Sequence, residues 1–259
     1  MKARSFVIAA VPAALLAAGP VRADDLAGKF SFGLQIGTQS DISGQVLKGG
    51  SGTLLGQPAS VNGKRYRDIY KPDLRYQAYL AYGVAAKLEL VARGTYYENT
   101  GVGVSAGSFK GKELFAFLGQ AEDPNSSSSN LVQLPYKEWG GELALRFYFA
   151  PQSRLKSFVA PVIGARQVNS MLLSLSAPDA GSRLMNVPFT KSGTVLLAGI
   201  DVGFAFDVTE HFFVGVDTGV RYQTAPAPEN ASQLSGLGGI DHSDARWTAP
   251  VVAMIGARF

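Results

Sequence analysis

The chain has 259 residues, among them 24 Lys or Arg, 20 Asp or Glu and no Cys. The absence of cysteine excludes disulfide bonds, thiolate catalysis and cysteine-based metal sites. A formal charge of +4, without any basic cluster interleaved with aromatic residues, gives no reason to expect a nucleic-acid partner. The 30 glycines and the 10% of aromatic residues instead favour a protein built from strands.

The first residues predict export. Lys2 and Arg4 precede a short apolar run over residues 6–18, and Val21-Arg22-Ala23 has the small-x-small pattern of a cleavage site. We therefore predict a signal peptide over residues 1–23, followed by a single domain over residues 24–259. The apolar run is shorter than the about 20 residues that a membrane-spanning helix needs. Cleavage removes three of the 24 basic residues and leaves 21 against 20 acidic ones, so most of the positive charge belongs to the signal.

Eight later segments are strand-like, and seven of them alternate between apolar and polar side chains. In the first of them, Phe30, Phe32, Leu34 and Ile36 share one face. The segments have about the 9–11 residues of a tilted membrane strand. The fifth is apolar on both faces and contains Pro161, so its register is not predictable. In chain order, the predicted strands cover residues 28–38, 73–83, 87–97, 139–149, 157–167, 195–207, 212–223 and 246–259.

The connections between these segments alternate in length. Residues 84–86, 150–156 and 208–211 form short links, whereas the connections after the first, third, fifth and seventh segments are long. The long ones are rich in Gly, Ser, Pro and Asn, and one includes the polar stretch 123–130. Short periplasmic turns that alternate with long extracellular loops are typical of bacterial barrels. The sequence thus predicts an all-β protein, a closed antiparallel transmembrane barrel of about eight strands.

Aromatic residues are placed at both ends of the predicted outward faces, with aliphatic residues such as Leu90, Leu145 and Val251 between them. Two aromatic girdles around an aliphatic band are expected where a barrel meets the two interfaces of a membrane. In a soluble β-sandwich the apolar faces form an internal core, and there is no reason for aromatic rings to gather at both ends of the strands. The predicted girdles contain Tyr76, Tyr82, Tyr96, Trp139, Phe147, Phe149, Phe204, Phe206, Phe212, Tyr222 and Trp247.

The segments 139–149 and 251–259, behind the export signal, resemble the small outer-membrane β-barrel proteins of Gram-negative bacteria, the broad OmpA-, OmpX- and OmpW-like group. The resemblance covers the whole predicted mature chain without identifying a subfamily. It implies an outer-membrane location, with contact to membrane lipid and lipopolysaccharide. The alternating end Ile255, Ala257 and Phe259 looks like the assembly signal of these proteins, which implies recognition by the barrel-assembly machinery.

Charged residues fall on the predicted inward face. Because facing residues of an antiparallel pair have a constant index sum, any register that pairs Glu89 with Arg146 also pairs Arg93 with Glu142. Asp201 and Asp217 are expected near each other across a short turn, either sharing a proton or held ionised by arginines. The predicted ion-pair network of the lumen consists of Arg75, Glu89, Arg93, Glu142, Arg146, Asp201, Asp217 and Arg221.

Two interpretations of these charges remain. They form a constriction that selects solutes, or they fill the lumen, since an eight-stranded barrel is just wide enough for side chains. We favour the plug, and with it a structural or surface-interaction role without enzymatic activity, cofactor or metal. The alternative is a narrow porin-like channel or a transporter of small or hydrophobic solutes.

A weaker alternative is a lipid-modifying enzyme or a protease that uses His242, which lies among Asp241, Ser243 and Asp244; His211 is expected in a periplasmic turn. The loops are the other place where function is expected. The loop over residues 42–71 is basic, and we consider contact with lipopolysaccharide beside a merely solvated loop. Residues 109–119 are expected to form a short lid or a strand extension. The extracellular ligand is not identified by the sequence.

Overall fold

The computed structural model describes residues 26–70, 73–99, 101–120, 136–177, 179 and 182–259. The predicted signal peptide, residues 1–23, and the polar stretch 123–130 lie outside the described residues. No helix within the described part of the chain is long and apolar enough to cross a membrane.

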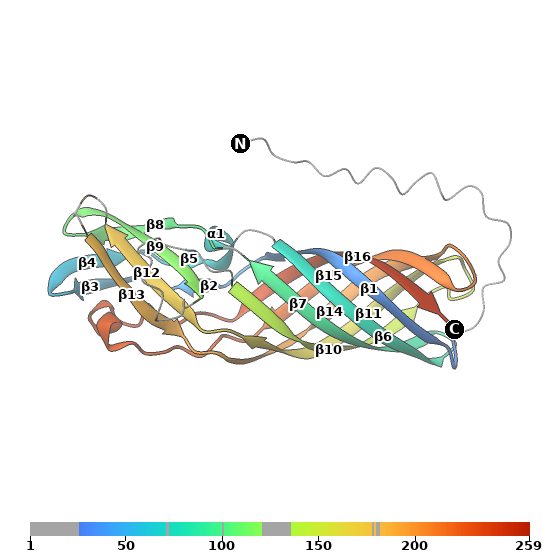
Figure 1. Cartoon of the computed structure of the whole chain (residues 1–259). Helices are drawn as coiled ribbons and strands as arrows, with labels where there is room; N and C mark the ends of the chain where they lie inside the picture. Colours follow the sequence, from blue (N-terminus) through green and yellow to red (C-terminus); the bar gives the residue numbers. More distant parts are fainter. Residues whose placement is uncertain (1–25, 71–72, 100, 121–135, 178, 180–181) are drawn as a thin grey trace, which may run out of the picture.

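Eight antiparallel strands close into a barrel, and each overlaps one predicted segment (Figure 1). The predicted all-β fold, a closed antiparallel barrel of eight strands, is confirmed. The order around the barrel is β1-β16-β15-β14-β11-β10-β7-β6. The strands are β1 (Phe30–Asp41), β6 (Asp73–Ala85), β7 (Leu88–Asn99), β10 (Tyr136–Tyr148), β11 (Leu155–Val168), β14 (Gly193–Asp207), β15 (Phe212–Gln223) and β16 (Arg246–Arg258).

The register of the strands fixes the width and the tilt of the barrel. The paired residues can be followed from strand to strand around the barrel. A row that starts at Phe212 of β15 returns to β15 at Tyr222, which is a stagger of ten residues (222 minus 212). With eight strands about 4.8 Å apart and a rise of about 3.3 Å per residue, this stagger gives a tilt of about 40° and about 2.5 Å of height per residue. The row runs through Phe212, Ala257, Phe32, Leu80, Ala92, Leu143, Ile163, Ala198 and Tyr222.

The outer wall is apolar and its rings lie at two heights. Phe212 and Tyr222 are ten residues apart on β15, which corresponds to about 25 Å along the axis, the height of the apolar band of a membrane barrel. Of the predicted girdle residues only Phe206 is half-buried, and the other ten are exposed on the outer wall. The register of β11 could not be predicted from the sequence. In the structure Phe158, Ala160 and Val162 face the lumen and Ile163 is exposed on the outer wall.

The long connections fold into a second β structure beyond one end of the barrel, which we call the cap (the described residues of 42–70, 101–120, 169–192 and 224–245). The end of the barrel that carries the C-terminus lies opposite to it (Figure 1). The stretch 109–119, expected as a lid or a strand extension, contains most of β9. The sheet order is β13-β12-β9-β8-β4-β3, with β2 and β5 paired beside it. The elements are β2 (Gln45–Leu47), β3 (Gly50–Leu54), β4 (Gln57–Val61), β5 (Lys64–Arg65), α1 (Tyr66–Ile69), β8 (Val104–Phe109), β9 (Lys112–Gln120), β12 (Met171–Ala177), β13 (Ser182–Thr190) and the 3-10 helix η3 (Ser232–Leu237).

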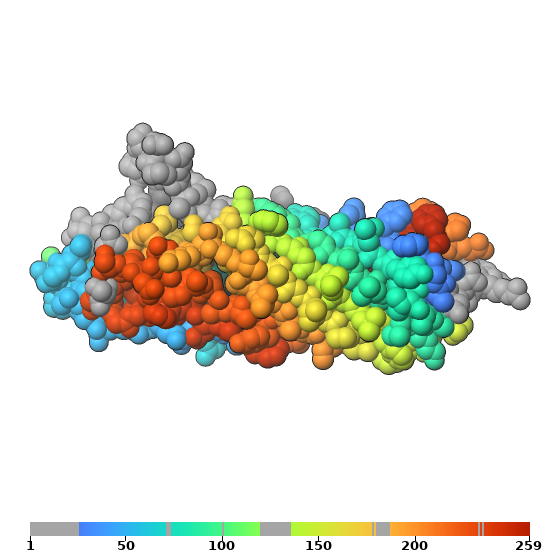
Figure 2. All heavy atoms as spheres, turned by 90° about the horizontal axis from the view of Figure 1, so that it is seen from below, coloured from blue at the N-terminus to red at the C-terminus, as the bar shows by residue number. Residues whose placement is uncertain are grey.

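The connection between β15 and β16 covers both edges of the cap sheet. Next to β13, Thr190 forms a bridge with Pro228, and the amide of Glu229 donates to the carbonyl of Phe189 at 3.1 Å. At the other edge η3 packs on β3 so closely that a Cβ on Gly52 would lie 1.8 Å from the carbonyl oxygen of Gly236. In the space-filling view the orange η3 region lies beside the light-blue β3–β4 hairpin (Figure 2). The cap therefore encloses an apolar core, which includes the fully buried Leu47, Leu173, Leu175, Phe189 and Leu237.

Candidate functional site: the charged lumen

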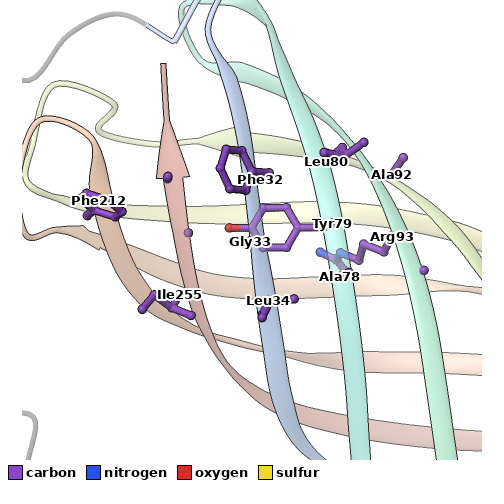
Figure 3. A pocket seen from close by; sticks show the side chains of 13 residues that line it. Phe32, Gly33, Leu34, Ala78, Tyr79, Leu80, Ala92, Arg93, Phe212 and Ile255 are labelled. Atoms are coloured by element: carbon purple, nitrogen blue, oxygen red, sulfur yellow. The ribbon is translucent and has the colours of Figure 1, made fainter.

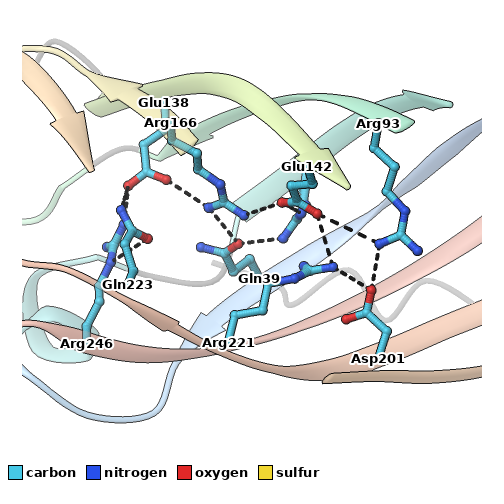
Figure 4. Close-up of polar contacts among 10 residues, drawn as sticks. Gln39, Arg93, Glu138, Glu142, Arg166, Asp201, Arg221, Gln223 and Arg246 are labelled. Atoms are coloured by element: carbon cyan, nitrogen blue, oxygen red, sulfur yellow. Dashed lines mark hydrogen bonds and ion pairs between the residues drawn. The ribbon is translucent and has the colours of Figure 1, made fainter. Parts of the chain in front are cut away.

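Glu142, which points inward from β10, is the centre of the charges in the lumen (Figure 4). Its Oε1 lies 2.6 Å from Nη2 of Arg75 and 2.9 Å from Nη2 of Arg166. Its Oε2 lies 3.3 Å from Nη2 of Arg221 and 3.8 Å from Nη1 of Arg93. All five side chains are at most 2% exposed. One carboxylate thus holds four guanidinium groups, from β6, β7, β11 and β15.

Strand alternation and register bring these groups together. In β10 the charged residues Glu138, Glu142 and Arg146 are separated by even numbers of residues, so they share the buried, inward face of the strand. The register pairs Glu142 with Arg93 and Arg146 with Glu89, the two pairs that the index sum predicts. The second pair is joined by an ion pair of 3.2 Å between Nη1 of Arg146 and Oε2 of Glu89.

Asp201 and Asp217 do not face each other, contrary to one expectation from the sequence. Asp201 pairs with Gly219 and Asp217 with Gly203, because the register of β14 and β15 is offset by two residues from the one that would oppose them. Arg93 joins the two carboxylates instead: its Nη1 lies 2.6 Å from Asp201 and its Nη2 lies 3.0 Å from Asp217. Arg221 adds a second contact of 2.7 Å to Asp201.

The outer half of the network was missed by the sequence analysis. Arg166 on β11 contacts Glu138 at 2.9 Å as well as Glu142, and Arg246 on β16 pairs with Glu138 and with Asp41, the latter at 3.2 Å. The signal for Glu138 was its spacing of four residues from Glu142, one residue outside the predicted segment. The signal for Arg246 was its position next to the outward-facing Trp247, because adjacent strand residues point to opposite faces. Arg166 lies in the strand whose register was not predictable.

Aromatic rings and a further ion pair fill the inner half of the lumen. The guanidinium of Arg146 lies over the ring of Phe158 at 4.7 Å, and that of Arg258 lies over Phe213 at 4.9 Å. The hydroxyl of Tyr148 donates to Glu89 at 2.8 Å. Lys156 pairs with Asp207 near the short turns. Arg146 and Arg258 are therefore buried against aromatic rings in this half of the lumen.

Tyrosines separate the charged lumen from the apolar cap. Arg246 lies 4.6 Å from the ring centre of Tyr66 and 5.7 Å from that of Tyr136, and Tyr70 packs on both rings. Burial raises the pKa of Tyr66 to about 12, and it raises the pKa of Tyr70 as well. The hydroxyls of Tyr66 and Tyr70 therefore stay protonated at neutral pH, so the tyrosine layer adds no charge beneath the apolar core.

The residues of the weaker catalytic hypothesis do not form a triad. His242 is exposed, and its Nδ1 lies 3.1 Å from Oδ1 of the adjacent Asp241. The hydroxyl of Ser243 donates to the carbonyl of Val46 at 2.9 Å, so its proton is already hydrogen-bonded to the backbone. His211 lies in the turn after β14, stacked on Phe259 with ring centres 5.5 Å apart. Among the described residues no group of three or more His, Cys, Asp or Glu is placed to hold a metal ion.

The predicted assembly-signal residues lie on the outer wall of β16. Ile255 and Phe259 are exposed, and the ring of Phe259 is stacked between Phe32, at 5.9 Å, and His211. Ala257 shares their face but is buried, because Phe32 and Phe212 are its neighbours on the adjacent strands.

A shallow hollow of about 870 Å³ lies on the same wall, lined by residues such as Leu34, Leu80 and Ile255 (Figure 3). Small residues form its floor, since Ala78 pairs with Gly94. The hollow opens on the apolar band of the wall, where acyl chains are the expected neighbours. It is separated from the charged lumen by the barrel wall, so the lumen remains the candidate site.

No family model matches the chain, and no curated protein matches it. Solved structures do resemble it. The outer membrane protein OprG from Pseudomonas aeruginosa has a TM-score of 0.47 at 13% identity, over 92% of this chain and 99% of that one. Neisserial surface protein A (NspA) has a TM-score of 0.37 at 14% identity, and the attachment invasion locus protein Ail of Yersinia pestis 0.37 at 10%, each over 90% of this chain and 99% of the other. The fold that the predicted resemblance implies, a closed barrel of eight antiparallel strands, is the one that the structure of this chain shows.

Proposed function

We propose that this protein is a closed outer-membrane barrel with a structural or surface-interaction role, without catalytic activity, whose lumen does not conduct solutes. The observation that carries the proposal is the Glu142 cluster, in which one buried carboxylate holds guanidinium groups from four other strands. Removing one partner from a buried ion pair costs about 3–5 kcal/mol. A water path through this cluster would have to separate several such contacts at once.

The cap supports the same proposal. A solute that enters from the outer end meets the apolar core around Leu173, Leu175 and Leu237 before it reaches the charged lumen. An ion would lose its hydration in the first layer, which is costly, and a hydrophobic molecule would meet buried charges in the second. Two layers of opposite chemistry in series exclude both classes of solute.

Planar-bilayer conductance tests the proposal. The purified barrel should give no reproducible openings at lipid and salt conditions under which a porin, reconstituted in parallel, conducts. Reproducible openings that the bulky substitution Arg93→Trp abolishes would overturn the plug and support the narrow-channel alternative. Swelling of liposomes in small sugars extends the test to uncharged solutes, and the proposal requires a swelling rate equal to that of empty vesicles.

A further inference from the structure

A polar pocket lies on the outer wall at the junction between barrel and cap. It has a volume of about 520 Å³ and is lined by Ser43, Gly44, Gln45, Lys48, Arg65 and Asp244. The pairing of Gln45 in β2 with Arg65 in β5 forms one wall. The amide of Asp244 donates to the carbonyl of Gln45 at 2.7 Å and ties the start of β16 to this ribbon.

Gly44 allows the chain to turn at this point. Its φ of +100° belongs to the region that favours glycine. A Cβ here would lie 2.8 Å from the carbonyl oxygen of Ala245 and 2.9 Å from the Cβ of Arg246. The backbone of the pocket is therefore held by the end of β1 and the start of β16, both of which belong to the rigid barrel.

The height of the pocket relative to the membrane follows from its neighbours on the outer wall. Ile42, the residue after β1, and Trp247 of β16 are 46% and 45% exposed, and the amide of Ile42 donates to the carbonyl of Trp247 at 2.8 Å. Tryptophan prefers the membrane interface. Ser43 is the next residue, and three residues at about 2.5 Å each place Gln45 within about 10 Å above this pair. The polar headgroup layer, about 5–8 Å thick on each side, is at this height.

The charged side chains that line the pocket are mainly cationic. Lys48 and Arg65 line it. Two acidic side chains lie beside them. Asp244 pairs with Lys48 at 3.2 Å, although both remain more than 40% exposed, and Asp68 accepts from the backbone amide of Arg65 at 3.0 Å. Of the charged side chains that line the pocket itself, Lys48 and Arg65 are cationic and Asp244 is anionic, so the lining carries a net positive charge. A guanidinium fork beside an ammonium group is suited to the oxygens of a phosphate.

We propose that this pocket binds the phosphate group of an anionic lipid in the outer leaflet. Phosphate oxygens accept from the guanidinium of Arg65 and the ammonium of Lys48, while the acyl chains lie against Trp247 and Ile42 below. The site is on the outer wall and does not depend on whether the lumen conducts.

Fluorescence quenching of Trp247 tests the site, because this indole lies directly below the pocket. In a Trp139→Phe background Trp247 is the sole tryptophan, since the chain has two. The probes are vesicles doped with brominated phosphatidic acid and, as the matched phosphate-free lipid, brominated diacylglycerol with the same chains. The phosphorylated lipid should quench Trp247 at a lower mole fraction than diacylglycerol does.

The double variant Lys48→Gln/Arg65→Gln should raise the half-quenching mole fraction of phosphatidic acid roughly 25-fold, at about fivefold per cation near a charged membrane surface. It should leave quenching by diacylglycerol unchanged. The charge-matched control Lys110→Gln/Lys112→Gln, on the β8–β9 hairpin of the cap, should behave as wild type. Equal effects of the two double variants, or no effect of the first, would overturn the proposal.

Two further measurements keep the test decisive. Asp244→Asn keeps both cations and removes the nearest negative charge, so it should lower the half-quenching fraction several-fold; an unchanged or higher value contradicts the proposal even if the double variant does not fold. Inorganic phosphate at millimolar concentration should not relieve the quenching. If it does, the pocket is a site for soluble anions and the assignment to a lipid is wrong.

Discussion

Replacing Glu142 by Gln removes one negative charge from the lumen and keeps the size of the side chain. The four guanidinium groups at 2.6–3.8 Å then lose their shared anion. The loss is not compensated nearby, because the charges of this part of the lumen are balanced in wild type. The six cations are Arg75, Arg93, Arg146, Arg166, Arg221 and Arg246, and the six anions are Asp41, Glu89, Glu138, Glu142, Asp201 and Asp217.

We expect Glu142→Gln to lower the free energy of unfolding by about 3–5 kcal/mol, the cost of leaving a buried charge without its partner. With a denaturant slope of about 3 kcal/mol per molar urea, the midpoint should fall by about 1–2 M. Unfolding from lipid vesicles is followed by the emission of Trp139 and Trp247, which both lie on the lipid-facing wall and move into water when the barrel leaves the membrane.

Glu113→Gln is the matched control, because Glu113 is exposed on β9 and the substitution is chemically identical. Its effect should stay within about 0.5 kcal/mol. If the two variants unfold at the same urea concentration, the lumen charges are hydrated and independent, and the reasoning about a buried network is refuted.

Two other predictions concern the wall and the cap. Leu145→Arg places a charge near the middle of the apolar band and should cost about 2–4 kcal/mol of folding free energy in vesicles, whereas Leu74→Arg, near the outer rim, should cost about 0–1; equal losses would contradict the assigned membrane position. The pKa of Tyr66, about 12 in the folded cap, exceeds the ordinary value of 10.0, so its contribution to stability is complete below pH 10 and is lost as the pH rises towards 12. The urea midpoint of wild type should therefore fall between pH 9.5 and 11.5 by more than that of Tyr66→Phe, and parallel losses would rule out this contribution.

Local alternation was sufficient to predict the barrel. A strand with one face in lipid and one in a charged lumen repeats every two residues, so its pattern is visible without knowledge of its partner. The same logic predicted the pairing of Glu89 with Arg146, since it depends only on index sums. It failed for β11, where Phe158, Ala160 and Val162 fill the inner part of the lumen and make the inward face as apolar as the outward one.

The cap could not be predicted in this way, because its strands pair between different connections. β12 pairs with β9 and β4 pairs with β8, so each is stabilised by a segment that lies far away in the sequence. Two of its strands, β3 and β4, are only five residues long, too short for a clear period. The outer ion pairs of the lumen share this problem in part: Arg166 could be placed inside only once the register of β11 was known, whereas Glu138 was missed because it lies one residue outside the predicted segment.

The seam between β1 and β16 determines when the molecule can finish folding. Phe30 and Phe259 exchange both of their backbone hydrogen bonds there, at 2.9 and 2.8 Å, so the two ends of the described chain meet. Joining ends more than two hundred residues apart carries a large loop-closure entropy, and pairing this distant in sequence is slow. Until β16 is in place, β1 has an unpaired edge that other chains can join. The barrel therefore cannot close before β16 has been made, and this edge is exposed to aggregation until the seam forms.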